Sequence, residues 1–243
     1  LMKRRAAQWA RENNTKTPTL YDIDFLLGVY DASRMGALRF KTDPNGDFLD
    51  NNKTTPTPPW SSIRELQVAA ESIEDDKDND EVKKWLSILI APGSSLGGAR
   101  PKANILDTDN SLWIAKFPSK SDTIDKAAWE YLAYELAIKA GIIMAPCKIE
   151  KIMGNYHTFF TKRFDRKNGK RIHFASAMTM TGNNEETIKD QHPSYLEIAE
   201  FISNHGVNIE ENLHQLWRRI VFNISISNTD DHLRNHGFIL TDE

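Results

Sequence analysis

An acid and an amide near the C-terminal end of the sequence have the types and the spacing for phosphoryl transfer. Asp230 and Asn235 are separated by four residues, between an apolar-faced segment that ends at Ile226 and an apolar run that begins at Gly237. Phosphoryl transfer needs a carboxylate that orients the attacking hydroxyl and accepts its proton, and an amide oxygen that holds a magnesium ion. The Asn-Thr-Asp-Asp sequence at 228–231 is also typical of an ordinary turn, so these residues alone leave both interpretations open.

A glycine-rich stretch upstream could hold the phosphates for this chemistry. It runs from Ser94 to Lys102 and leads into a predicted strand, Lys102 to Asp107. Gly97 and Gly98 would let backbone N–H groups approach phosphate oxygens closely, and Lys102 would add a positive charge. The spacing is wrong for a Walker A loop, and a plain flexible loop remains an alternative.

A lysine on the next predicted strand is the second candidate for phosphate binding. Lys116 lies near the end of the strand Leu112 to Phe117, whose apolar residues would bury its stem. Protein kinases place a phosphate-clamping lysine on a strand after the glycine-rich loop, and that lysine pairs with a glutamate of the following helix. The helix predicted over Asp122 to Ala140 offers Glu130 and Glu135, and Glu130 is preferred because it lies nearer the middle. A surface lysine and a surface glutamate are the alternative.

Length and composition limit the other function classes. The 243 residues fit one large domain or two small ones, and 40% hydrophobic residues suffice for a packed core. A net charge of −3 gives no general reason to expect nucleic-acid binding. No apolar run approaches the ~20 residues of a membrane span. Cys147 is the single cysteine, which excludes an internal disulfide and a cysteine-based zinc site and suits a reducing cytoplasm.

The order of the predicted elements is that of a kinase small lobe followed by its large lobe. The glycine-rich loop, two strands and a long helix are followed by a hairpin turned at Gly154-Asn155 and then by mostly helical sequence. We therefore predict an α+β, bilobal protein-kinase-like fold, with an antiparallel sheet in the N-lobe and a mostly helical C-lobe. The predicted domains are 1–90, an N-terminal subdomain; 91–164, the N-lobe; and 165–243, the start of the C-lobe. Other predicted elements are helices over Met2 to Glu12, Leu20 to Leu27, Trp60 to Ile73, Glu81 to Ile90, Ser194 to Asn204 and Glu210 to Ile226, and a strand over Arg34 to Lys41.

Two other chemistries have weaker support. His232 and His236 are four residues apart and could face one way on a helix, as zinc ligands do, but Gly237 and the strand pattern argue against a helix, and no third ligand is obvious. Hydrolysis by a Ser-His-Asp triad lacks the Gly-x-Ser-x-Gly elbow.

Four motifs, taken in chain order, resemble those of the HipA family of bacterial serine/threonine kinases, the toxins of toxin–antitoxin pairs. They are Ser95-Leu96-Gly97-Gly98-Ala99-Arg100-Pro101-Lys102, Ile114-Ala115-Lys116-Phe117-Pro118, Lys162-Arg163-Phe164-Asp165-Arg166 and Asn228-Thr229-Asp230-Asp231-His232-Leu233-Arg234-Asn235. The resemblance covers nearly the whole chain, and the four motifs together are specific where any one would not be.

The resemblance implies a role for each matching residue. Asp230 corresponds to the catalytic acid, Asn235 to a magnesium ligand and His232 to a position near the nucleotide. Lys116 corresponds to the phosphate-contacting lysine and Glu130 to its partner. Ser95 corresponds to a serine that the family autophosphorylates. The implied ATP-contacting loop comprises Gly97, Gly98, Ala99, Arg100 and Lys102, and the implied hinge, where the main chain would hold the adenine, comprises Lys162, Arg163 and Phe164.

The resemblance also implies cofactors, partners and a location. The implied cofactors are ATP and Mg²⁺. The implied partners are a protein substrate linked to translation and a HipB-like helix-turn-helix antitoxin, with DNA contacted only through that antitoxin. The implied location is the cytoplasm, without a membrane association. Two alternatives are a non-catalytic partner of the antitoxin in operator repression and a small-molecule kinase. The family pattern begins before Leu1 and places a second magnesium-binding Asp after Leu240, so we expect a fragment whose own activity is in doubt.

Overall fold

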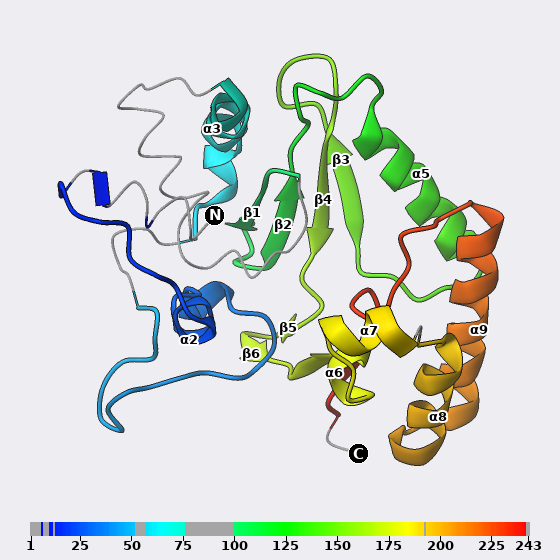
Figure 1. The fold of residues 1–243 in the computed structure, drawn as a ribbon. Coiled ribbons are helices and arrows are strands. Elements are labelled where there is room, and N and C mark those ends of the chain that lie inside the picture. The colour runs from blue at the N-terminus through cyan, green and yellow to red at the C-terminus, as the bar shows by residue number, and fades with distance from the viewer. Residues whose placement is uncertain are drawn as a thin grey trace. The chain divides into compact units, whose positions relative to one another are not determined.

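The computed structural model describes residues 6, 10–11, 13–51, 57–75, 100–191 and 193–241. The chain divides into two compact units, and each is described by itself. The first comprises Leu1–Tyr131 and Pro146–Arg163, and the second comprises Leu132–Ala145 and Phe164–Glu243. Helices combine with antiparallel sheets, which confirms the predicted α+β class (Figure 1). The unit boundary at Arg163 lies one residue from the domain limit predicted at 164, whereas the limit predicted at 90 lies outside the described residues.

A four-stranded antiparallel sheet forms the centre of the first unit. Its spatial order is β1-β2-β4-β3. The strands are β1 (Lys102–Leu106), β2 (Leu112–Lys116), β3 (Cys147–Glu150) and β4 (Thr158–Lys162). β1 and β2 lie within the two predicted strands, and β3 and β4 form the predicted hairpin. The turn between β1 and β2 is tight because Asn110 adopts a left-handed conformation (φ 60°), which asparagine tolerates better than most residues.

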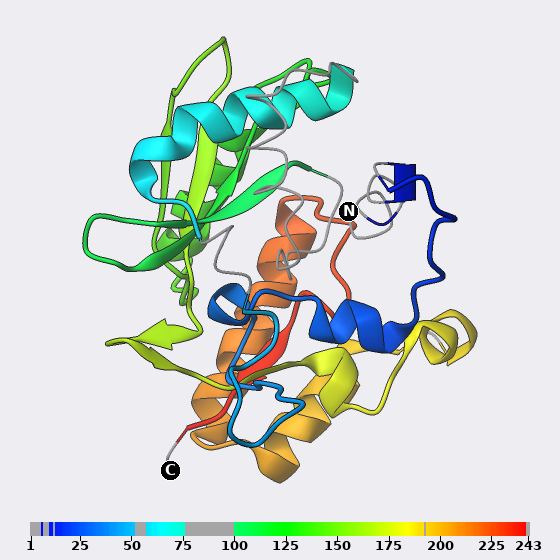
Figure 2. The same ribbon diagram turned by 90° about the vertical axis from the view of Figure 1, so that its left-hand side faces the viewer.

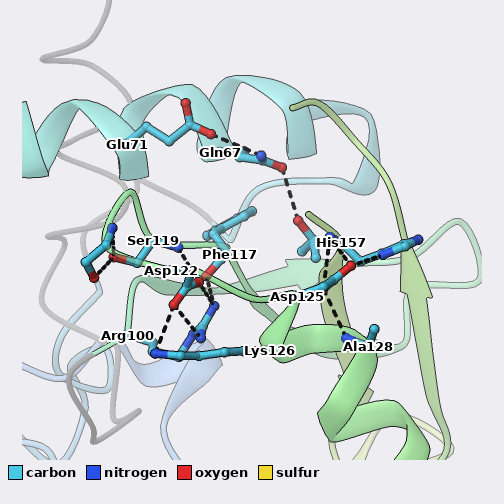
Figure 3. A network of polar contacts seen from close by, with 12 residues as sticks. Gln67, Glu71, Arg100, Phe117, Ser119, Asp122, Asp125, Lys126, Ala128 and His157 are labelled. Carbon is cyan, nitrogen blue, oxygen red and sulfur yellow. Dashed lines mark hydrogen bonds and ion pairs between the residues drawn. The ribbon is translucent and has the colours of Figure 1, made fainter. Parts of the chain in front are cut away.

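Helix α3 (Ile63–Asp75), preceded by the short 3₁₀ turn η2 (Trp60–Ser62), packs on this sheet (Figure 2). Its apolar residues recur three and four positions apart, so they line one face of the helix. The core residues that α3 and the sheet share are Ile63, Leu66, Ala69, Ala70, Ala103, Ile105, Trp113, Ala115, Phe117 and Phe160. The buried amide of Gln67 accepts a hydrogen bond from the Thr158 hydroxyl (3.1 Å) and thereby ties α3 to β4 (Figure 3).

The segment before α3 contains helix α2 (Asp22–Leu27) and the 3₁₀ turn η1 (Asp31–Ser33). The strand predicted over Arg34 to Lys41 is wrong: the chain there forms only an isolated bridge between Phe40 and Leu49. The reason is the buried Arg34, whose guanidinium donates to the carbonyls of Leu26 (2.8 Å), Val29 (2.9 Å) and Leu49 (3.1 Å). A side chain therefore organises this backbone where a sheet ladder would otherwise do so. The helix predicted over Glu81 to Ile90 and most of that over Met2 to Glu12 lie outside the described residues.

The second unit is mostly helical. Helix α5 (Lys126–Lys139) begins in the first unit and ends in the second, two residues before Gly141, whose φ of 76° suits the end of a helix. The other described helices are α6 (Ala177–Met180), α7 (Glu185–Gln191), α8 (Tyr195–His205) and α9 (Ile209–Ser225). One small antiparallel sheet pairs β5 (Arg166–Lys167) with β6 (Lys170–Arg171). Another pairs β7 (Phe174–Ser176) with β8 (Gly237–Ile239). The buried core of this unit comprises Ala177, Ile198, Ile202, Leu216 and Leu233.

The described parts of the chain include no helix with both the length and the apolar character that crossing a bilayer requires.

The core between α3 and the sheet yields a stability prediction. Leu66→Ala should lower the free energy of unfolding by about 2–5 kcal/mol, because Leu66 is fully buried and its loss leaves a cavity. Leu38→Ala, which truncates the same side chain at an exposed position of the same unit, should change it by less than about 0.5 kcal/mol. Urea unfolding followed by circular dichroism measures both, and equal effects would contradict the described core.

Candidate functional site

Two lysines face each other across neighbouring strands of the sheet. The register of β1 and β2 pairs Lys102 directly with Lys116, so both side chains lie on one face of the sheet. Lys116 Nζ forms an ion pair with a carboxylate oxygen of Glu130 on α5 and lies 5.1 Å from the centre of the Phe159 ring. Of the two glutamates that the sequence offers, Glu130 is the one in contact with Lys116. Like charges placed directly opposite destabilise a sheet, so this pair has a cost that a bound anion would remove.

The charges around these lysines change the protonation equilibria of their neighbours. Burial, followed by the neighbouring charge of Lys116, lowers the pKa of Lys102 from its ordinary value of 10.5, and the carboxylate of Glu130 only partly opposes this. Burial likewise raises the pKa of the nearby Cys147 thiol and so favours its uncharged form. The charges of Lys102, Lys116 and Glu130 therefore act on one another as one cluster on this face of the sheet.

Buried Asp122 fixes the start of α5 and therefore the place of Glu130. It accepts hydrogen bonds from Arg100 (2.7 and 3.3 Å), from the N–H of Ser119 (2.9 Å) and from Lys126 (2.9 Å), as Figure 3 shows. Burial alone would raise the pKa of Asp122, but the N–H of Ser119 and the charges of Lys126 and Arg100 hold the pKa below its ordinary value.

Asp125 caps the first turn of α5. It accepts the N–H of Ala128 (3.1 Å) and bonds to the ring and backbone N–H of His157, just before β4 (Figure 3). The helix consequently begins at Lys126 and not at Asp122 as the sequence pattern predicts, because both aspartates are used to anchor its start.

The glycine-rich loop is described only at its C-terminal end. Ser95, Gly97, Gly98 and Ala99 lie outside the described residues. Arg100 is described, and its guanidinium donates to Asp122 and to the carbonyl of Phe117 (3.1 Å). The structure thus gives Arg100 an anchoring contact, and its predicted nucleotide contact stays a prediction.

The three predicted hinge residues have different surroundings. The buried guanidinium of Arg163 donates to the carbonyl of Ser33 (3.0 Å) and to Oδ1 of Asn104 (2.8 Å), so a nucleotide contact there can concern only the main chain. Lys162 ends β4, and its N–H donates to the carbonyl of Pro146 (2.8 Å). Phe164 belongs to the second unit, where its exposed ring packs edge-on against Phe174 with 5.1 Å between ring centroids.

The predicted catalytic acid and magnesium ligand lie on one loop of the second unit, between α9 and β8. The Asp230 side chain is 95% exposed, and its backbone carbonyl accepts a hydrogen bond from Nδ2 of Asn235 (2.7 Å). The N–H of Asn235 donates to the carbonyl of His232 (2.8 Å). His232 Nε2 lies 4.0 Å from Oδ1 of Asp230, and its buried Nδ1 has no hydrogen-bond partner among the described residues. The loop therefore brings together all three residues that the sequence predicts for it.

A fourth residue of this loop escaped the sequence prediction. The side chain of Asp231 is buried and accepts hydrogen bonds from the Tyr195 hydroxyl (2.7 Å), Nδ2 of Asn223 (2.7 Å) and Nε2 of His236 (2.9 Å). Burial would raise the pKa of Asp231, but these donors hold it below its ordinary value. Burial and the Asp231 carboxylate raise the pKa of Tyr195 to about 12. The sequence signal is the Asp230-Asp231 doublet, which turn chemistry also explains.

The zinc alternative has no support in this loop. His236 contacts Asp231, and the residues that the structure describes contain no group of three or more His, Cys, Asp and Glu side chains able to hold a metal ion.

Comparison with known proteins identifies the family. Residues 94–243, which include both groups of candidate residues, match the HipA-like C-terminal domain. The chain belongs to this family. The HipA resemblance predicted from the four motifs is thereby confirmed. No curated protein matches the chain.

A solved HipA structure gives the same fold. The HipA of Shewanella oneidensis MR-1, solved in a complex with HipB and operator DNA, is 18% identical with a TM-score of 0.60. The match covers 98% of this chain but 58% of that one, so this chain spans little more than half the length of that HipA. The proinflammatory kinase CtkA of Helicobacter pylori is 20% identical with a TM-score of 0.44, over 59% of this chain and 49% of that one.

The lowered pKa of Lys102 leads to a prediction about pH. If Lys102 binds the phosphates of ATP, affinity for magnesium-free ATP should be full below the pKa of Lys102 and should fall as the pH rises through it, because only the ammonium form attracts phosphates. Because that pKa lies below 10.5, the fall should begin at a lower pH than for an ordinary lysine. Calorimetric titrations of the full-length protein at increasing alkaline pH measure this.

Lys102→Arg is the matched control for this titration. Arginine keeps its charge throughout this range, so the variant should retain its affinity to higher pH. Identical pH profiles for the two proteins would show that Lys102 does not bind the phosphates.

Proposed function

We propose that the full-length protein is a HipA-type serine/threonine kinase of the cytoplasm, which transfers the γ-phosphoryl group of ATP to a host protein and arrests growth. The observation that carries this proposal is the contact of Lys116 with Glu130 beside Lys102. A strand lysine paired with a helix glutamate holds the phosphates of ATP in protein kinases. The loop with Asp230 and Asn235 offers the remaining groups for the same reaction.

Each residue has a task that its surroundings support. Lys102 and Lys116 attract the phosphates, and Glu130 fixes the position of the Lys116 ammonium. The exposed carboxylate of Asp230 orients the substrate hydroxyl and accepts its proton. Asn235 uses its Nδ2 on the carbonyl of Asp230, which leaves the amide oxygen as the atom for a metal.

Magnesium fits this donor set. Mg²⁺ takes oxygen ligands and usually keeps several waters beside one or two protein groups and the substrate phosphates, so one amide oxygen from this loop is a reasonable contribution. When bound, the ion neutralises charge on the phosphates.

Regulation and partners form a finer part of the proposal. A phosphate on Ser95 would repel the nucleotide from a loop that must hold phosphates, so autophosphorylation there would silence the kinase. The Shewanella HipA was solved with HipB and operator DNA. We infer a HipB-like helix-turn-helix antitoxin for this protein, with DNA contacted through it. That same complex supports a second candidate function, a non-catalytic role in operator repression.

A substitution of the proposed base tests the first candidate. Asp230→Asn in the full-length protein should lower kcat by roughly 10²–10⁴-fold, because the amide cannot accept the proton. Asp190→Asn makes the same change on the exposed surface of α7 and should leave kcat unchanged. Transfer of ³²P from γ-labelled ATP to protein measures both, and an unchanged rate in Asp230→Asn would remove Asp230 from the reaction.

The labelled product separates the candidate functions. A protein kinase should label serine or threonine, and Ser95→Ala should abolish labelling of the kinase itself. Label in a small alcohol with none in protein would indicate a small-molecule kinase. Repression of the operator together with the antitoxin, without any transfer, would favour the non-catalytic role.

A further inference from the structure

We propose that Asp231 is a positioning residue that holds Asp230 and Asn235 at a fixed separation for phosphoryl transfer; this inference rests on the proposed function. The two neighbouring aspartates have opposite surroundings. The side chain of Asp230 is 95% exposed and that of Asp231 is 7% exposed. Asp231 is therefore held by the protein, whereas Asp230 is open to a substrate.

The three donors to Asp231 come from three different places in the second unit. Tyr195 begins α8, Asn223 lies near the end of α9, and His236 directly precedes β8. Asn223 precedes the loop and His236 follows it, so a single carboxylate connects its two ends. Hydrogen bonds to a charged acceptor are roughly twice as strong as those between neutral groups, which makes this connection stiff.

The remaining contacts of the loop work in the same direction. Its backbone is tied to α6, because the N–H groups of Ala177 and Met178 donate to the carbonyls of His236 (2.8 Å) and Leu233 (3.1 Å). The bond from Asn235 Nδ2 to the Asp230 carbonyl (2.7 Å) then closes a ring of six residues. With the ends held by Asp231 and the backbone held by α6, the distance between the proposed base and the proposed metal ligand is determined by the fold.

Replacing Asp231 by asparagine should loosen this arrangement while changing little volume. One of the two carboxylate oxygens becomes an NH₂ group, which cannot accept from donors such as Tyr195 and Asn223. All three donors reach Oδ2, so an asparagine oxygen in that place keeps their bonds but lacks the charge that strengthens them. The second bond of His236, to Oδ1 at 3.0 Å, is lost. A displacement of about 1 Å in a reacting group can cost on the order of 10²-fold in rate.

The test compares kcat with KM in the full-length protein. Asp231→Asn should lower kcat by about 10–100-fold and change the KM for ATP by less than about 3-fold, because Lys102, Lys116 and Glu130 belong to the other unit. Tyr195→Phe removes one donor and keeps the carboxylate, so kcat should fall by about 3–10-fold.

The control is Asp31→Asn, which changes a largely buried carboxylate of the first unit that is ion-paired with Arg39 at 2.5 Å. This variant should lower the melting temperature and leave kcat unchanged. A kcat for Asp231→Asn within about 2-fold of wild type, with a lowered melting temperature as in the control, would assign Asp231 a structural role only and overturn the inference.

Three further outcomes are decisive. If Asp231→Asn does not fold, Tyr195→Phe decides the matter, because an unchanged kcat in that variant overturns the inference. If the wild-type protein transfers no phosphoryl group, both proposals fail. If the wild type is active, Asp230→Asn is inactive and Asp231→Asn is fully active, only the inference fails.

Discussion

The repulsion between Lys102 and Lys116 is the constraint around which the first unit is built. An antiparallel register sets the two ammonium groups opposite each other, and strand pairing alone does not relieve the repulsion. The core under the sheet holds this register, because a shift by one residue would turn Ala103, Ile105 and Ala115 out of the core. Glu130 forms an ion pair with Lys116, and the contacts of Asp122 and Asp125 fix the helix that carries Glu130.

Sequence patterns predicted much of the fold because helix and strand formation depends largely on residues that are close along the chain. The alternation of apolar residues located β1, β2 and β4, and helical spacing located α8 and α9 to within one or two residues. Helix α7 was not predicted because its sequence is almost entirely polar; Asn184 supports it by accepting the N–H groups of Glu186 (2.8 Å) and Thr187 (2.9 Å). The false strand over Arg34 to Lys41 has the opposite cause, since contacts with a buried arginine replaced strand pairing there.

The candidate site likewise contains contacts that the sequence could predict and contacts that it could not. The partner of Lys116 could be chosen from the sequence because a strand and the helix that follows it are close along the chain. The environment of Asp231 could not, because its burial depends on Tyr195, which lies 36 positions away, and on the packing of α8 beside α9 (Figure 1). Nothing local distinguishes the two residues of an aspartate doublet. The tertiary structure alone determines which carboxylate is enclosed and which remains in solvent.

The buried Arg163 bears on where an independently folding piece of this protein can begin. The family match starts at residue 94, yet the guanidinium of Arg163 donates to the carbonyl of Ser33, which lies well before that point. The face of the sheet that α3 covers likewise needs residues 63–70. A protein cut at residue 94 would leave a buried cation without one of its acceptors and a hydrophobic sheet face in water, and both are costly. The start of the family match at residue 94 is therefore not a boundary of folding.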